Sequence, residues 1–165
     1  MELFDLVDKQ DAIIGATDKP TAHATGQLHR VAGVYVFDKQ GRLYVQVHKK
    51  SGGLYDHSIG GHISQDESYE EGAKREAEEE LGITQHLTKL SVFYSDEGED
   101  MQHMFGLFEC VADDSWHFEL NDEVEEIIPM TLEDIQNLMA TNPEKFTGGF
   151  INTMKEYVRI KGGKQ

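Results

Sequence analysis

Three glutamates in one short segment are the residues most able to do chemistry in this chain of 165 residues. Glu76, Glu79 and Glu80 stand at positions i, i+3 and i+4, so a helix would place their carboxylates on one face. Like charges at that spacing repel each other, and a bound cation would relieve the repulsion. Carboxylate oxygens suit Mg²⁺ or Mn²⁺, which are commonly shared with substrate phosphates. A helix whose glutamates form only a solvated face is the alternative interpretation.

The segment that carries these glutamates has the pattern of an amphipathic helix. Its apolar positions recur every fourth residue, at Tyr69, Ala73, Ala77 and Leu81. Polar capping residues precede the segment, and Gly82 follows it as a C-cap. We therefore expect a helix over 68–81 with one side in the core and the other side available to a ligand.

The elements that would position this helix are mostly short strands. Alternating and apolar runs predict hairpins over 3–7 with 12–16 and over 31–37 with 43–47, then strands over 89–95, 104–111 and 124–129. A glycine-bracketed loop is expected over 51–61, and helices over 131–141 and around Phe150, Met154, Tyr157, Val158 and Lys161. No linker divides the chain. We expect one domain over 1–165, with 1–30 as an N-terminal hairpin extension.

Composition excludes several classes of protein. Fifteen Lys and Arg against 31 Asp and Glu give a net charge of −16 and a pI near 4.7, which disfavours binding to nucleic acid or to anionic lipid. Cys110 is the only cysteine, so neither an intrachain disulfide nor a zinc site of several thiolates can form. With no signal peptide or membrane-spanning run, we expect a soluble cytoplasmic protein.

The spacing from Gly61 to Ile83 resembles the signature of the Nudix hydrolase superfamily. All seven fixed positions are matched, by Gly61, Glu67, Arg75, Glu76, Glu79, Glu80 and Gly82. The resemblance implies an α/β fold, of the mixed α+β kind, in which an α/β/α sandwich surrounds a mixed sheet. It implies that Glu76, Glu79 and Glu80 bind Mg²⁺ or Mn²⁺, with Gly61 near the metal through its backbone.

The same resemblance implies a reaction. Members of the superfamily cleave a phosphoanhydride bond in a nucleoside diphosphate linked to a group X or in another small diphosphate. Glu79 and Glu80 are the expected catalytic carboxylates, and Glu67 and Arg75 resemble an internal ion pair that supports the loop and helix. A catalytically silent diphosphate sensor of the same fold is a rival hypothesis, against which the intact glutamates argue. The identity of X is not readable from the sequence.

A wider resemblance connects the chain to the Nudix branch related to isopentenyl-diphosphate isomerase. It is carried by residues 7–9 with 14–15, 28–30, 60–62 and 142–147. The isomerases place a catalytic cysteine where this chain has Gly60, so isomerase activity is the disfavoured alternative. Cys110 lies far along the sequence and is interpreted as a small buried hydrophobe.

The isomerase metal site contains histidines, and parts of it can be matched here. His29 and His62 stand at matching positions, His23 is one residue away from the usual spacing, and Asp100 lies only roughly where that branch has a carboxylate. Structural, hydrogen-bonded histidines are the alternative. Whether the three histidines hold a second metal stays open at this point.

Further candidates lie outside the signature. His48 and Lys49 at the end of a hairpin strand, and Arg30 before a strand, are candidates to bind the substrate's phosphates. Glu126, Glu123 and Glu99, in falling order, are candidates for an additional catalytic carboxylate. We expect a small-molecule diphosphate as the partner, specificity from the loops 49–59 and 96–102, and a homodimer if the protein assembles.

Overall fold

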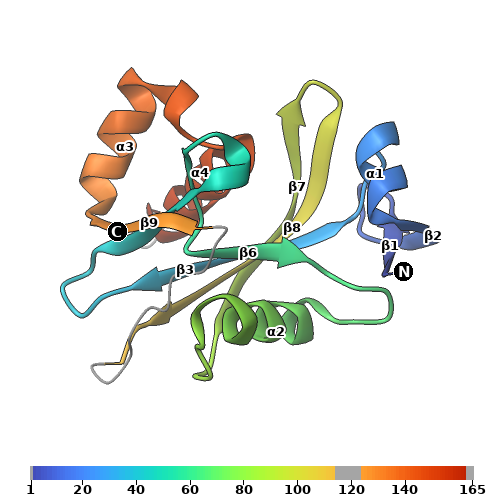
Figure 1. Cartoon of the computed structure of the whole chain (residues 1–165), viewed down its shortest axis with the longest axis horizontal. Coiled ribbons are helices and arrows are strands. Elements are labelled where there is room, and N and C mark those ends of the chain that lie inside the picture. Colours follow the sequence, from blue (N-terminus) through green and yellow to red (C-terminus); the bar gives the residue numbers. More distant parts are fainter. Residues whose placement is uncertain (1, 114–123, 163–165) are drawn as a thin grey trace.

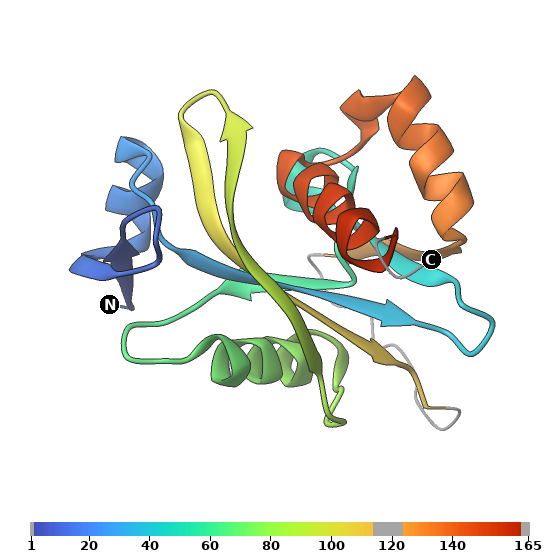
Figure 2. The same cartoon turned by 180° about the vertical axis from the view of Figure 1, so that it is seen from behind.

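A mixed β-sheet with helices on both faces forms the body of the molecule in the computed structural model, which describes residues 2–113 and 124–162 (Figures 1 and 2). The strands follow the order β5-β4-β3-β8-β7, with β6 beside β3 and β9 beside β4. Their bounds are β3 Arg30–Phe37, β4 Leu43–His48, β5 Leu54–Asp56, β6 Ile59–His62, β7 Thr88–Gly98, β8 Met101–Val111 and β9 Val124–Met130. The parallel β3–β8 pair among antiparallel neighbours makes the sheet mixed. The expected fold class is confirmed.

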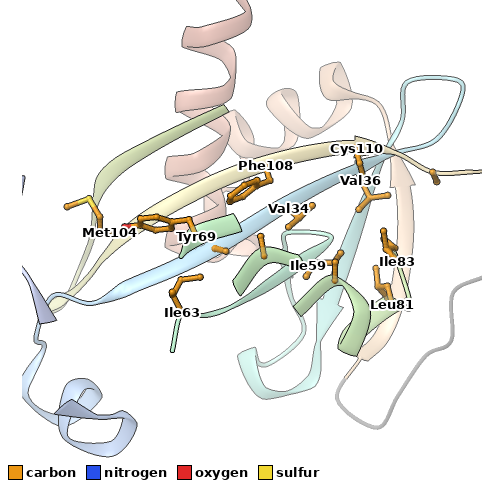
Figure 3. Close-up of a cluster of buried hydrophobic side chains, with 14 of the residues drawn as sticks. Val34, Val36, Ile59, Ile63, Tyr69, Leu81, Ile83, Met104, Phe108 and Cys110 are labelled. Carbon is orange, nitrogen blue, oxygen red and sulfur yellow. The ribbon is translucent and has the colours of Figure 1, made fainter. Parts of the chain in front are cut away.

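The central strand β3 builds two cores because its side chains alternate between the faces of the sheet. Val34 and Val36 pack against helix α2 (Tyr69–Leu81), in the cluster shown in Figure 3. Tyr35 and Phe37 face the other way, toward α3 (Leu132–Thr141) and α4 (Gly148–Gly162). No helix in the described part of the chain is both long and apolar enough to cross a membrane.

Helix α2 lies where the sequence pattern predicts it. Ser68 caps its N-terminus in a reciprocal capping box with Glu71, and Gly82 ends it in a left-handed conformation with φ of 67°. The apolar positions that recur every fourth residue are all buried. The opposite face, which carries the glutamates, is therefore left to the cavity described below.

The N-terminal residues form a small module of their own. Strands β1 (Leu3–Val7) and β2 (Ile13–Asp18) pair antiparallel, which confirms the expected hairpin. The short helix α1 (Lys19–Thr25), which the sequence analysis missed, follows directly. Its local signals were present, since Asp18 is the N-cap and Gly26 the left-handed C-cap. The module lies beside the β7–β8 hairpin (Figure 1), where Gln102 donates to the Gly26 carbonyl at 3.0 Å.

Two expectations about the sheet were wrong in part. The β3–β4 hairpin is joined at only one registered pair, Phe37 with Leu43, because β4 pairs mainly with β5 and β9. The segment expected to be a loop over 51–61 contains strands β5 and β6. Ser58 fixes the turn between them, since its hydroxyl accepts from the Val36 amide and donates to the Tyr44 carbonyl. These pairings depend on partners distant in sequence.

Candidate functional site

A cavity of about 730 Å³ lies beside the ligand face of α2. Its walls come from α2, from β6, from the β7–β8 hairpin and from the start of α4. The lining residues with the most evident chemistry are Glu76, Glu79, Glu80, Gly61, His62, His23, His103, His48, Asp56, His57, Glu97 and Thr147. The three signature glutamates therefore share one cavity wall with groups from distant parts of the chain.

Gly61 lets the Glu76 carboxylate approach the backbone of β6. A Cβ atom at Gly61 would lie 2.3 Å from Cδ of Glu76. Burial raises the pKa of Glu76, as do the charges of Glu79 and Glu2, although Arg75 acts in the opposite direction. A bound cation would lower that pKa again. Oxygen donors, close approach and excess negative charge together fit a hard divalent ion such as Mg²⁺.

The other two glutamates flank the same wall. Glu79 is the more open, with a side chain 60% exposed, whereas Glu80 accepts the Gly60 amide at 3.2 Å. The signature helix is thus coupled to β6 at Gly60 as well as at Gly61.

Arg75 connects the signature loop to the helix. Its guanidinium donates to both carboxylate oxygens of Glu67 at 2.9 Å and to the His62 carbonyl at 3.0 Å. It also reaches Glu76 at 2.7 Å and Glu79 at 3.4 Å. The hydrogen bonds from Arg75 lower the pKa of Glu67. This is the ion pair that the resemblance implies; its role as a support of the site stays a prediction.

Four histidines converge where the cavity adjoins a neighbouring hollow. His23 of α1, His29 before β3, His62 of β6 and His103 of β8 bring one ring nitrogen each to within 4.8 Å of all the others. The Nε2 atoms of His23 and His62 are 3.1 Å apart. Nε2 of His29 is buried and has no hydrogen-bond partner among the described residues. A buried lone pair close to three other imidazoles is a group of donors that could hold a metal ion.

Hydrogen bonds orient two of these rings. Nδ1 of His29 donates to the Gln27 carbonyl at 2.8 Å, and Nδ1 of His103 donates to the Glu97 carboxylate at 2.7 Å. In the neutral rings each Nε2 therefore carries a lone pair. Burial, together with neighbouring positive groups, lowers the pKa of His29 to about 4 and that of His62 to about 3. Four converging imidazoles fit a transition metal such as Zn²⁺ better than Mg²⁺.

Other candidates from the sequence lie differently. His48 lines the cavity, whereas Lys49 is exposed on a short 3₁₀ turn, η1 (Lys49–Ser51), and is absent from the described lining. Arg30 is paired with Asp11 at 2.8 Å and lies over the Tyr69 ring, so its placement gives no support to a phosphate contact.

Two of the additional carboxylate candidates are not among the described residues that line the cavity. Glu126 is exposed on β9, opposite Val47, and is not among the described residues that line the cavity. Glu99 and Asp100 line a neighbouring hollow beyond His23 and His103. Glu123 lies outside the described residues.

The sequence analysis did not single out His103, Glu97, Asp56 or His57, all of which line the cavity, although the last three lie within the loops 49–59 and 96–102 from which specificity was expected. No local spacing marks them as a group, because Asp56 and His57 lie at the end of β5, Glu97 lies in β7 and His103 lies in β8. His103 and Glu97 lie next to segments expected to be strands, whereas Asp56 and His57 lie in the segment expected to be a loop over 51–61. Cys110, in contrast, is buried in the core beside α2, as expected.

The chain is similar to known proteins over most of its length. The model of the NUDIX domain matches residues 27–148. An isopentenyl-diphosphate Delta-isomerase of Serratia proteamaculans is 34% identical over 94% of this chain and 90% of its own length. The uncharacterized Nudix hydrolase YfcD of Escherichia coli is 31% identical over 81% of this chain and 76% of its own length.

Solved structures share the fold. Protein DR0079 of Deinococcus radiodurans superposes with a TM-score of 0.77 at 24% identity, covering 94% of this chain and 98% of that one. The NUDIX domain of Shewanella oneidensis NrtR, solved with ADP-ribose, gives a TM-score of 0.60 at 12% identity, covering 87% and 98%. At these identities the likeness concerns the fold alone.

Proposed function

The chain belongs to the Nudix family, and on that premise we propose that it is a divalent-metal-dependent hydrolase of a small diphosphate. The bond cleaved is a phosphoanhydride, in a nucleoside diphosphate linked to another group or in a related diphosphate. The observation that carries the proposal is the wall of Glu76, Glu79 and Glu80, which face one cavity while Gly61 leaves room for the first of them.

The three carboxylates would hold Mg²⁺ or Mn²⁺, which supplies charge neutralisation of the diphosphate and acidifies a water molecule. Glu79 and Glu80 are the groups proposed to accept a proton from the attacking water. Arg75 keeps the carboxylates oriented through its contacts with Glu67 and Glu76. We keep a cytoplasmic location and a homodimer as predictions.

The histidine cluster is proposed as a second metal site, distinct in its chemistry from the carboxylate site. Its orphaned, buried His29 Nε2 and its four converging imidazoles fit a transition metal ion. His23 comes from α1, whereas His62 and His103 come from the sheet. An ion held there would tie the N-terminal module to the domain and add positive charge at the end of the cavity.

A second candidate function is isomerisation of isopentenyl diphosphate. The full-length similarity to a Delta-isomerase and the histidine cluster favour it. Against it, Gly60 offers no thiol at the cavity, and the Cys110 thiol is buried in the core, where burial raises its pKa to about 11. Hydrolysis therefore ranks first.

The test is product release from a substrate panel with Mg²⁺ or Mn²⁺ and with chelator. The panel contains nucleoside di- and triphosphates, dinucleotides, nucleotide sugars, coenzyme A and isoprenoid diphosphates. Glu80→Gln should abolish most of the metal-dependent release, while Glu78→Gln, on an exposed part of the same helix, should retain it. Conversion of isopentenyl to dimethylallyl diphosphate by the wild type would reverse the ranking, and binding without turnover would favour a sensor.

A further inference from the structure

A smaller hollow of about 270 Å³ opens beside Glu80. It is lined by Gln46, His48, Ser51, Asp56, Gly60 and Glu80, and four of these residues also line the main cavity. Gln46 and Asp56 are registered partners across β4 and β5, so their side chains project from the same face of the sheet. We call this hollow the side pocket. The side pocket lies next to the signature glutamates, because Glu80 is part of its own lining.

Asp56 is held in the wall of the side pocket by three donors. Its Oδ1 accepts the His57 amide at 2.8 Å, His57 Nδ1 at 2.7 Å and the Thr147 hydroxyl at 3.2 Å. Its Oδ2 has no hydrogen-bond partner among the described residues. Burial raises the pKa of Asp56, but the hydrogen bonds and charge interaction with His57, together with the hydrogen bond from Thr147, outweigh burial, and the pKa is lowered. The side pocket therefore presents one fixed anionic acceptor.

A buried hydrogen-bonded chain runs from the core to that carboxylate. Nδ1 of His57 donates to Asp56, Nε2 of the same ring is hydrogen-bonded to the Thr153 hydroxyl at 2.7 Å, and that hydroxyl is hydrogen-bonded to the Tyr35 hydroxyl at 2.7 Å. Each bond in such a chain polarises the next. Gly33 makes room for the ring, since a Cβ there would lie 2.7 Å from Cδ2 of His57. Three hydrogen-bonded residues, His57, Thr153 and Tyr35, thus orient a single acceptor at the cavity.

Gln46 supplies the complementary donor. Its residue is only 3% exposed, yet Nε2 of its amide has no hydrogen-bond partner among the described residues. A buried amide nitrogen without a hydrogen-bond partner costs free energy, and most buried polar groups in proteins are paired. A ligand oxygen in the side pocket would give Gln46 Nε2 such a partner. An acceptor and a donor, directly opposite each other on neighbouring strands, define what can bind between them.

We propose that the side pocket binds a sugar diol of the substrate. This inference rests on the proposed function and names its substrate class. One hydroxyl of a vicinal diol can donate to Asp56 Oδ2 while an oxygen of the pair accepts from Gln46 Nε2. A hydrocarbon chain can form neither hydrogen bond. Its binding would leave Asp56 Oδ2 and Gln46 Nε2 unpaired, which disfavours an isoprenoid in the side pocket. The substrate is therefore a nucleotide or nucleotide sugar, and an isoprenoid diphosphate is a poor ligand.

The experiment measures ligand affinity by titration calorimetry in Mg²⁺, separately from turnover. The probes are isopentenyl diphosphate, which has no sugar, ADP, which has the nucleoside ribose alone, and ADP-ribose, which has both. The variants are Asp56→Asn and Gln46→Met, with exposed Asp134→Asn and Gln136→Met as controls. Ligands that are turned over are titrated against the same variants in a Glu79→Gln background. Thermal melts establish that each variant is folded.

We expect Asp56→Asn to weaken ADP-ribose about 10- to 100-fold, the range for a hydrogen bond to a charged group, and Gln46→Met to weaken it roughly 3- to 10-fold. Isopentenyl diphosphate should change little. A parallel loss for ADP would place the nucleoside ribose in the side pocket, and a loss confined to ADP-ribose would place the second sugar there.

Three results would overturn the assignment: no loss in either variant, an equal loss for isopentenyl diphosphate, or wild-type preference for the isoprenoid. Each is readable without hydrolysis. Ligand binding that depends on Asp56, without turnover, would support the side pocket and contradict the proposed hydrolase activity. Turnover that neither substitution changes would support the hydrolase activity and contradict the side pocket.

Discussion

Replacing Gly61 by alanine tests the close approach on which the carboxylate site depends. The new Cβ would lie 2.3 Å from Cδ and 2.6 Å from Oε1 of Glu76. An ordinary contact between such atoms is about 3.5 Å, so the carboxylate must move by roughly 1 Å. The atoms that meet are the far end of a flexible side chain, which can turn away. We therefore expect little loss of stability and a large loss of function.

The size of that loss follows from the displacement. A misplacement of about 1 Å at a reacting centre can cost on the order of 100-fold in rate. The shift would also break the contact between Arg75 and Glu76, now 2.7 Å long, and so disturb the pair that orients both residues. We expect kcat/KM of Gly61→Ala to fall by about 100-fold with the substrate that the panel identifies, and Mn²⁺ affinity to weaken in parallel.

Gly15→Ala is the matched control, because a Cβ there meets only Leu6 at an ordinary 3.7 Å and Gly15 is not among the described residues that line the cavity. Melting curves, Mn²⁺ titration and steady-state rates should be measured on all three proteins. Full activity and full Mn²⁺ affinity in folded Gly61→Ala would refute the reasoning. So would equal losses in both variants.

Three more predictions concern the metals and acid stability. Mg²⁺ at 100 times its dissociation constant should stabilise the fold by about 2.7 kcal/mol, which a thermal melt would record as a rise of several degrees in melting temperature. Glu80→Gln should abolish most of this rise, and an equal rise in both proteins would contradict the assignment. His103→Ala should lower Zn²⁺ affinity at least 10-fold and exposed His86→Ala should not, as measured by competition with a chromogenic chelator; equal affinities would remove His103 from the site. Because the pKa of Glu67 is lowered in the folded protein, its ionised carboxylate stabilises the fold above the unfolded pKa near 4.5, and this contribution is lost as pH falls through the folded pKa. Glu67→Gln should therefore lower stability at pH 7 and reduce the pH dependence of stability at acid pH, measured by urea unfolding. An unchanged profile would show that the ion pair with Arg75 contributes nothing.

The sequence determined what depends on neighbours along the chain. The spacing of Glu76, Glu79 and Glu80 fixed a common face once the segment was helical, and Ser68 and Gly82 marked its ends. The N-terminal hairpin, the β7 and β8 region and both C-terminal helices follow from periodicity and turn residues in the same way. These features were predictable because each is specified within about four residues.

Only the tertiary structure decided which residues meet from separate elements. His103 joins His23, His29 and His62 because the parallel pairing of β3 with β8 and the docking of α1 bring four elements together. Arg30, which the sequence analysis named as a candidate to bind the substrate, forms an ion pair with Asp11.

The same reason explains why the side pocket was invisible in the sequence. Asp56 and Gln46 become partners only when β5 pairs with β4, and the chain from Tyr35 through Thr153 and His57 crosses both the sheet and α4. Strand pairing and helix docking gain their energy from burial of surface that is distant in sequence. Local composition therefore specified the metal-binding helix, while long-range packing placed the groups that surround it.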